Sequence, residues 1–256
     1  MLVMAVANQK GGVGKTTCCV NLSAELGRMG VRTLVVDADP QGNSSSALGI
    51  DRNSLERSVY DVIAGNLSAS EAVVATAWEN VFLLPATLDL AGAEVELAGA
   101  MSRESRLRRK MADLKGFDLV LIDCPPSLGL LTVNALVASD GILVPVQCEY
   151  FALEGLGQLL RTMDLVRSYL REDLSLSGLV MTMFDGRTRL SREVVEEVRR
   201  QFGDLVLETV IPRNVKLSEA PSHGRPIGYY DPLSAGAEAF RELAKEVSQR
   251  WLGRKL

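Results

Sequence analysis

The stretch Gln9–Thr17 contains residue types that can bind a polyphosphate. It follows the apolar run Leu2–Ala7 and leads into a segment of helical pattern, so a buried strand should deliver the chain to a glycine-rich turn. The bare N–H groups of such a turn can surround an anion at the positive end of the helix. The pattern predicts that Lys15 reaches the β- and γ-phosphates of a nucleotide and that the Thr16 hydroxyl binds Mg²⁺. A glycine turn that only links a strand to a helix is the alternative. The loop residues expected around the phosphates are Gly11, Gly12, Val13, Gly14, Lys15, Thr16 and Thr17.

Acidic residues follow two other apolar runs. Asp37 and Asp39 occur in the sequence Asp-Ala-Asp-Pro-Gln-Gly-Asn, and Asp123 ends a run of apolar residues. Because ligands of an open α/β sheet bind at the carboxyl ends of the strands, these carboxylates are expected beside the phosphate loop. Asp123 has the position of a Walker B carboxylate, which reaches Mg²⁺ through water, and Asp37 and Asp39 can order metal-bound and attacking water. A turn rich in Asp, Pro and Gly is the alternative for residues 37–43.

Runs typical of buried strands alternate with longer segments of helical period along the chain. This alternation predicts an α/β fold, with a mostly parallel twisted sheet of about seven or eight strands and helices on both faces. No shift in composition marks a linker, so residues 1–256 are expected to form a single domain. The expected strands are Leu2–Ala7, Thr33–Asp37, Val81–Leu84, Leu119–Asp123, Gly141–Val146, Leu179–Met183 and Leu205–Val210. The expected helices are Lys15–Met29, Ala72–Thr76, two within Leu88–Lys115, Ser127–Ala138, Phe151–Leu170, Arg189–Phe202 and Ala235–Trp251.

Composition and charge restrict the class of protein. The net charge of −4 argues against DNA binding by bulk charge, so any contact with nucleic acid must be a local basic patch. The sequence has no apolar run of about 18 residues and no leader pattern, which predicts a cytoplasmic protein. The cysteines have no metal-ligand spacing and are expected to be buried free thiols. They are Cys18, Cys19, Cys124 and Cys148.

Four segments together resemble one known family. The run Asn8–Thr17 resembles the deviant Walker A loop of the ParA/MinD class of P-loop ATPases, whose signature lysine is Lys10 here. With Gln9, the loop resembles that of the ParA/Soj branch, whose members serve chromosome and plasmid partition. MinD proteins usually carry glycine at this position. The acidic run that starts at Asp37 matches the second motif of the family. Two further segments resemble partition ATPases closely, so that the resemblance covers nearly the whole chain. They are Met183–Ser191 and Ile211–Ser222.

The resemblance implies a Mg²⁺-dependent ATPase with a composite site. It implies that Lys10 crosses to the ATP of a partner subunit, so that ATP joins two monomers face to face. A second cation near the γ-phosphate suits phosphoryl transfer, which depends on positioning and charge neutralisation. Asp39 would position or activate the attacking water, and Asp37 would support the metal shell with Thr16 and Asp123. Residues corresponding to Pro212 and Asn214 line the adenine pocket in the family. The implied catalytic residues are thus Lys10, Lys15 and Asp39.

The resemblance also implies partners. Arg187 and Lys216 fall where related proteins place cations that contact DNA, and Arg189 and Arg213 extend the patch. Such cations would contact the phosphates of double-stranded DNA without sequence preference and with strong salt dependence. Ordinary solvated charge, including ion pairs along a helix face, is the alternative. The implied protein is an ATP-bound homodimer on the nucleoid, released by slow hydrolysis that a ParB-like centromere-binding protein stimulates.

Two other functions remain open from the sequence. One is a MinD-like or orphan ParA-like ATPase that positions a membrane or cell-pole cargo. The apolar stripe of Ala235–Trp251 has helical spacing that a core can absorb, and only Leu252–Leu256 remains beyond it, so stable membrane association is not expected. The other is a nucleotide-gated DNA-binding regulator, for which the sequence carries no recognition-helix signal.

Overall fold

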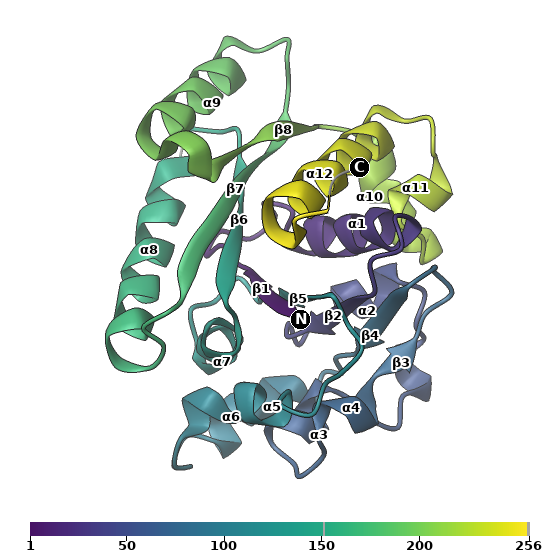
Figure 1. Ribbon diagram of the computed structural model, residues 1–256, viewed down its shortest axis with the longest axis vertical. Helices are drawn as coiled ribbons and strands as arrows, with labels where there is room; N and C mark the ends of the chain where they lie inside the picture. The colour runs from purple at the N-terminus through teal and green to yellow at the C-terminus, as the bar shows by residue number, and fades with distance from the viewer. Residues whose placement is uncertain (151, 255–256) are drawn as a thin grey trace.

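A computed structural model describes residues 1–150 and 152–254 of the chain. Its centre is an eight-stranded sheet in the order β3-β4-β2-β5-β1-β6-β7-β8 (Figure 1). All neighbouring strands run parallel except the short β3, which is antiparallel to β4. The carboxyl ends of the parallel strands therefore meet along one edge of the sheet. The strands are β1 Leu2–Val6, β2 Thr33–Asp37, β3 Val74–Ala75, β4 Val81–Leu84, β5 Leu119–Asp123, β6 Gly141–Gln147, β7 Ser175–Phe184 and β8 Val206–Pro212.

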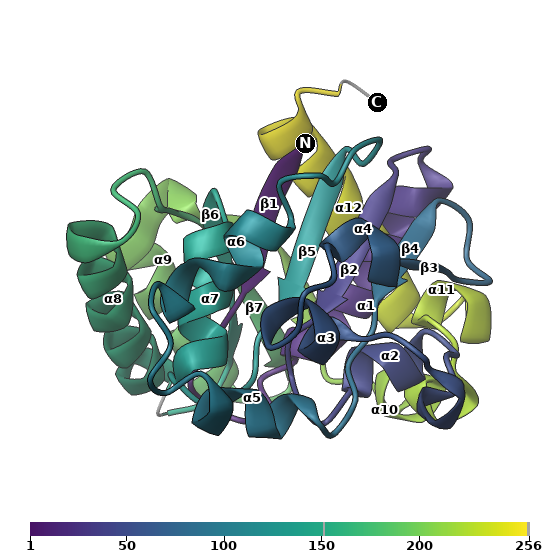
Figure 2. The ribbon, with the colours of Figure 1, turned by 90° about the horizontal axis from the view of Figure 1, so that it is seen from below.

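The described helices cover both faces of this sheet. Helices α1 and α12 lie on one face, and α3, α5, α6 and α7 lie on the other (Figures 1 and 2). The α-helices are α1 Lys15–Arg28, α2 Asn43–Ala47, α3 Val59–Ile63, α4 Ala69–Ala72, α5 Leu90–Glu96, α6 Arg106–Lys110, α7 Leu130–Ala138, α8 Ala152–Tyr169, α9 Arg189–Phe202, α10 Val215–Glu219, α11 Ile227–Tyr230 and α12 Ala235–Leu252. Short 3-10 segments are η1 Arg52–Ser54, η2 Arg103–Ser105, η3 Gly203–Leu205 and η4 Ala220–His223.

Two hydrophobic cores fill the space between the helices and the sheet. Successive side chains of a strand point to opposite faces, so Leu34 and Val36 of β2 pack in one core and Val35 in the other. All three are fully buried. Burial on both faces explains why these strands are continuous runs of Val, Ile and Leu. The predicted α/β fold, with its mostly parallel sheet and helices on both faces, is confirmed.

Several element boundaries differ from the sequence prediction. The helix expected at Ala72–Thr76 is wrong, because α4 ends at Ala72 and Val74–Ala75 pairs with β4 as a strand. Ser68 and Glu71 do form the capping box, but it caps a helix that starts at Ala69, three positions before the expected start at Ala72. The elements that the sequence missed have two to five residues, too few for a hydrophobic period to be visible. The predicted start of α8 at Phe151 lies outside the described residues.

Helix α12 packs its apolar stripe into the core beside α1, as predicted. The side chains of Phe240, Leu243, Ala244 and Val247 are fully buried. In the part of the chain that the structure describes, no helix is both long and apolar enough to cross a membrane.

The outer edge of β8 is covered by the side chain of Glu246 from α12. Its Oε1 accepts a hydrogen bond from the backbone N–H of Glu208 at 2.8 Å, and its Oε2 accepts one from the N–H of Thr209 at 3.0 Å. From the other side, the guanidinium of Arg199 donates to the carbonyl of Glu208 at 3.1 Å. Edge strands expose unpaired backbone groups that can pair with another chain, and here side chains occupy them.

Replacement of Glu246 tests this edge contact. We expect Glu246→Ala to lower the free energy of unfolding by about 1–3 kcal/mol, because backbone donors lose a charged acceptor. Urea denaturation followed by circular dichroism measures the change. The matched control is Glu242→Ala on the same helix, which removes only an exposed pair with Lys245 and should change stability by less than about 0.5 kcal/mol. Equal effects of the two variants would contradict this role of Glu246.

Candidate nucleotide-binding site

The loop between β1 and α1 has the geometry of an anion site. Gly12 and Gly14 adopt φ values of +74° and +97°, a region that disfavours any residue with a Cβ. Gly14 is the N-cap of α1, and no side chain caps the helix there. The first N–H groups of α1 therefore have no side-chain acceptor, and the positive end of the helix dipole lies at the same place. Both features favour an anion there. The loop predicted from the sequence thus has the backbone geometry of an anion site, and its binding of phosphate stays a prediction.

Lys15 is held inside this loop. Its side chain is only 7% exposed, and its Nζ donates to the backbone carbonyl of Lys10 at 3.3 Å. Burial lowers the pKa of Lys15, while the negative charge of Asp123 opposes that shift. An ammonium with one neutral acceptor in a buried position is ready to pair with an anion that enters the loop.

Asp37 and Asp123 end neighbouring strands in register with each other, and both are fully buried. Asp123 Oδ2 accepts hydrogen bonds from the hydroxyls of Thr16 and Ser44, both at 2.7 Å. Asp37 Oδ2 accepts from the backbone N–H of Ser45 at 2.8 Å and from its hydroxyl at 2.7 Å. The three residues predicted to surround the metal are thus brought together.

This cluster fits a hard cation such as Mg²⁺. Asp123 Oδ1 is buried and has no hydrogen-bond partner, although buried polar atoms almost always have one. Burial raises the pKa of both Asp37 and Asp123, as expected where a positive charge is needed to balance them. Among the described residues, no group of three His, Cys, Asp or Glu side chains could hold a metal alone. Hydroxyl, water and phosphate oxygens would complete the shell, as is usual for Mg²⁺.

Asp39 lies two residues beyond β2 at the same end of the sheet. It is 8% exposed, and its Oδ1 accepts from the N–H of Gln41 at 2.9 Å. Its charge acts on Lys15 and on Asp123, so the three groups lie in one electrostatic neighbourhood. The free carboxylate oxygen can orient a water molecule beside the phosphate loop.

A cavity of about 330 Å³ adjoins the phosphate loop. Pro212 and Asn214, the residues predicted to line an adenine pocket, line this cavity together with Gly14 and Thr17. Asn214 Oδ1 accepts from the N–H of Lys216 and caps α10, so the side-chain amide group remains as a donor. A mostly apolar slot with a few polar groups suits the base of a nucleotide.

Thr182 ties the phosphate loop to the end of β7. Its hydroxyl donates to the carbonyl of Val13 at 2.8 Å, and its side chain lines the cavity. The next residue, Met183, has φ +53°, an uncommon value for a residue with a side chain, and it also lines the cavity. Such strained backbone is typical of binding sites, where the surrounding structure maintains it.

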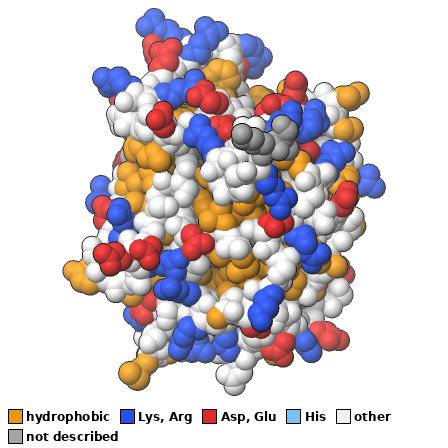
Figure 3. Space-filling model, in the orientation of Figure 1, with side chains coloured by type: hydrophobic (Ala, Val, Ile, Leu, Met, Phe, Trp, Pro, Cys, Tyr) orange, Lys and Arg blue, Asp and Glu red, His pale blue; other side chains and the backbone are white. Residues whose placement is uncertain are grey.

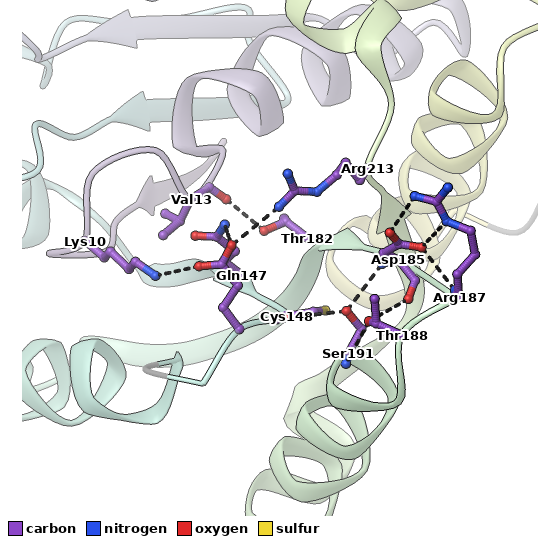
Figure 4. A network of polar contacts seen from close by, with 11 residues as sticks. Lys10, Val13, Gln147, Cys148, Thr182, Asp185, Arg187, Thr188, Ser191 and Arg213 are labelled. Atoms are coloured by element: carbon purple, nitrogen blue, oxygen red, sulfur yellow. Dashed lines mark hydrogen bonds and ion pairs between the residues drawn. The ribbon is translucent and has the colours of Figure 1, made fainter.

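Lys10 does not join Lys15 in its own loop. Its Nζ forms an ion pair with Glu149 Oε2 at 3.3 Å (Figure 4). Its backbone N–H donates to Asn8 Oδ1 at 3.1 Å. Asn8 in turn donates to the carbonyl of Pro145 in β6 at 2.7 Å. The predicted signature lysine is therefore near the nucleotide site but directed to an acidic side chain of its own subunit.

The four cations predicted to contact DNA are all paired with carboxylates. Arg187 donates to both oxygens of Asp185, at 2.9 and 2.8 Å, which lowers the pKa of Asp185 to about 2. On the face shown in Figure 3, basic and acidic side chains are interspersed rather than grouped by sign. The patch is thus a set of ion pairs in this structure. The remaining pairs are Arg189–Glu193 at 2.6 Å, Arg213–Glu149 at 3.4 Å and Lys216–Glu219 at 2.8 Å.

Sequence reasoning missed five residues of this site. Ser44 and Ser45 follow the acidic motif directly, and their hydroxyls were the available signal for hydrogen bonds to its carboxylates. The other three form contacts with partners 64 to 169 positions away in sequence, so no local pattern marks them; they are Asn8, Glu149 and Thr182. All four cysteines are buried and free, as predicted, and burial raises the pKa of Cys18 to about 12.

The glycine loop, the buried Lys15 and the strand-end carboxylates together define a P-loop ATPase. The sequence profile of a family described as an AAA domain matches residues 1–176. The chain is 55% identical over 247 residues to the sporulation initiation inhibitor protein Soj of Bacillus subtilis, covering 96% of this chain and 98% of that protein. It is 51% identical over 248 residues to the chromosome-partitioning ATPase Soj of Treponema pallidum, covering 96% and 97%. The chain belongs to the Soj/ParA family of chromosome-partitioning ATPases, as the sequence motifs predicted.

A solved structure adds a nucleotide complex of similar fold. It is titled cobyrinic acid a,c-diamide synthase from Mycobacterium smegmatis, with bound ATP analog and magnesium. It is similar to this chain with a TM-score of 0.85 and 44% identity, covering 100% of this chain and 98% of its own. Its title names a different reaction from those of the curated relatives, which are more similar to this chain in sequence.

Thr182→Val tests the contact between β7 and the phosphate loop. The variant keeps the shape of the side chain but removes the donor to Val13, and we expect ATP to bind about twofold to tenfold more weakly. Titration with a fluorescent ATP analogue measures the affinity. Thr209→Val is the control, since its hydroxyl donates to Glu246 at the far edge of β8. Unchanged affinity in Thr182→Val, or an equal loss in the control, would contradict the role of this hydroxyl.

Proposed function

We propose that this chain is a partition ATPase that binds ATP and Mg²⁺, forms a face-to-face homodimer, and hydrolyses ATP slowly. The observation that carries the proposal is the cluster of buried Lys15, Asp37 and Asp123, in which Asp123 accepts from the Thr16 hydroxyl and has one oxygen without a hydrogen-bond partner. The two Soj relatives, at 55% and 51% identity, supply the cellular role of chromosome partition.

The nucleotide would bind with its phosphates in the loop. The N–H groups at residues 11–17 and the ammonium of Lys15 would surround the phosphates, and the base would enter the cavity beside Pro212 and Asn214. Thr16, Asp37 and Asp123 would hold the magnesium ion directly or through water. The ion, when bound, supplies charge neutralisation at the phosphates.

Hydrolysis needs an oriented water and added positive charge. Asp39 would orient the attacking water with its free carboxylate oxygen. Lys10 would leave its own subunit and contact the nucleotide of the partner. A cation supplied in trans accelerates phosphoryl transfer by about 10³–10⁵-fold in related chemistry, because it stabilises the charge of the transition state.

The ATP-bound dimer would contact double-stranded DNA through Arg187, Lys216, Arg189 and Arg213. Each of these cations is at least partly exposed and pairs with a carboxylate of its own subunit. Exposed ion pairs contribute little free energy, so a DNA phosphate can replace the carboxylate at low cost. We propose that a ParB-like protein stimulates hydrolysis and that the dimer resides on the nucleoid in the cytoplasm. The burial of the apolar stripe of α12 favours this function over that of a membrane-positioning ATPase.

Variants of the two loop lysines test the composite site. We expect Lys15→Ala to lose ATP binding, because the buried cation that balances the phosphates is removed. Lys10→Gln should bind ATP as a monomer but fail to dimerise. Both are measured in an Asp39→Ala background, which should slow hydrolysis and preserve the dimer, by nucleotide titration and multi-angle light scattering. Normal ATP-dependent dimers of Lys10→Gln would refute the trans role of Lys10.

Charge reversal tests the DNA contacts. Arg187→Glu and Lys216→Glu should weaken binding to DNA of unrelated sequences and reduce the slope of affinity against salt by about one per lost contact. Fluorescence anisotropy at several salt concentrations, with ATP present, measures both quantities. Lys245→Glu is the control, because this exposed lysine lies on α12 and pairs with Glu242. Equal losses in all three variants would show a general charge effect and contradict this patch.

A further inference from the structure

Glu149 binds the signature lysine within the same subunit. Its side chain lies in the segment between β6 and α8 and is 45% exposed. Lys10 is 34% exposed, and its ammonium has Glu149 as an ion-pair partner at 3.3 Å. The two residues are 139 positions apart in sequence, so the contact arises from the fold, which places the ends of β1 and β6 side by side.

The carboxylate of Glu149 is held in position by a side chain at the end of β6. Gln147, the last residue of β6, is 9% exposed, and its Nε2 donates to Glu149 Oε1 at 2.6 Å. The backbone of Lys10 is fixed by Asn8, which is anchored to Pro145 of the same strand. Both partners of the ion pair are therefore fixed to β6, and only the flexible stem of Lys10 is free to leave.

Arg213 shares the same carboxylate. It extends from the segment after β8, and its guanidinium lies 3.4 Å from Glu149 Oε1, while Lys10 contacts Oε2 (Figure 4). Two cations thus compete for one negative charge. Each repels the other, so the removal of either strengthens the hold of Glu149 on the one that remains.

A carboxylate and a phosphate attract the same ammonium, so Glu149 and a phosphate compete for Lys10. We propose that Glu149 is a positioning residue that retains Lys10 in its own subunit and competes with the partner's nucleotide for it. The inference rests on the proposed trans role of Lys10. A stronger Lys10–Glu149 ion pair raises the dissociation constant of the ATP-bound dimer. Arg213 weakens this ion pair because it shares the carboxylate of Glu149. Because exposed ion pairs contribute little free energy, the hold is readily reversible.

Substitutions of the two partners of Lys10 should have opposite effects. In the Asp39→Ala background with ATP and Mg²⁺ and without DNA, Glu149→Gln should lower the dimer dissociation constant by about twofold to fivefold, the range for one exposed ion pair. Arg213→Gln should raise it, because Glu149 then holds Lys10 alone. Sedimentation velocity over a range of protein concentrations measures both constants. A purely structural role of this cluster would shift both variants in the same direction.

Two controls separate this inference from the proposed function. Glu193→Gln removes a neighbouring carboxylate that pairs with Arg189 rather than Lys10, and it should leave the dissociation constant unchanged. An equal gain in that variant, or no gain in Glu149→Gln, overturns the inference while the dimer itself stands. Normal dimers of Lys10→Gln overturn the trans role of Lys10 and with it the inference.

Discussion

Two carboxylates, Asp37 and Asp123, are fully buried side by side at the ends of neighbouring strands. Burial of two negative charges costs free energy, and the groups around them offset that cost. Hydroxyls of Thr16, Ser44 and Ser45 offset part of the cost. These donors come from the first turns of α1 and α2, so the carboxylates also fix where both helices begin. One oxygen of Asp123 is buried without a hydrogen-bond partner, which leaves a lone pair available to a cation.

Much of the fold and of the phosphate site could be predicted from the sequence. Strands buried on both faces must be continuous runs of apolar residues, which made β2 and β5 visible with correct boundaries. The phosphate loop is local in sequence, because its glycines, its lysine and its threonine all lie within residues 11–17. The rule that parallel strands bind ligands at their carboxyl ends then brought Asp37 and Asp123 to the loop.

Contacts between distant side chains could not be predicted in the same way. The sequence indicated Lys10 as a functional cation but gave no sign of its carboxylate partner Glu149, which lies 139 positions away. Lys10 pairs with a residue in the segment after β6, and the sequence contains 32 acidic residues that could have served. Short elements escaped for a related reason, since the pairing of Val74–Ala75 with β4 is decided by tertiary contacts rather than by local propensity.

The edges of the sheet limit how copies of this chain can assemble. One outer strand, β3, has only two residues, and at β8 the side chains of Glu246 and Arg199 occupy backbone groups of the outer edge. Growth by strand addition, the route to open fibres, is therefore disfavoured at both edges of the sheet. The strand at one edge is too short to pair well, and the backbone donors at the other edge already have side-chain acceptors. A nucleotide that joins two copies at the loop face would instead give a closed pair. In the proposed dimer, assembly would respond to the state of the ligand rather than to protein concentration alone, and it would end at two subunits.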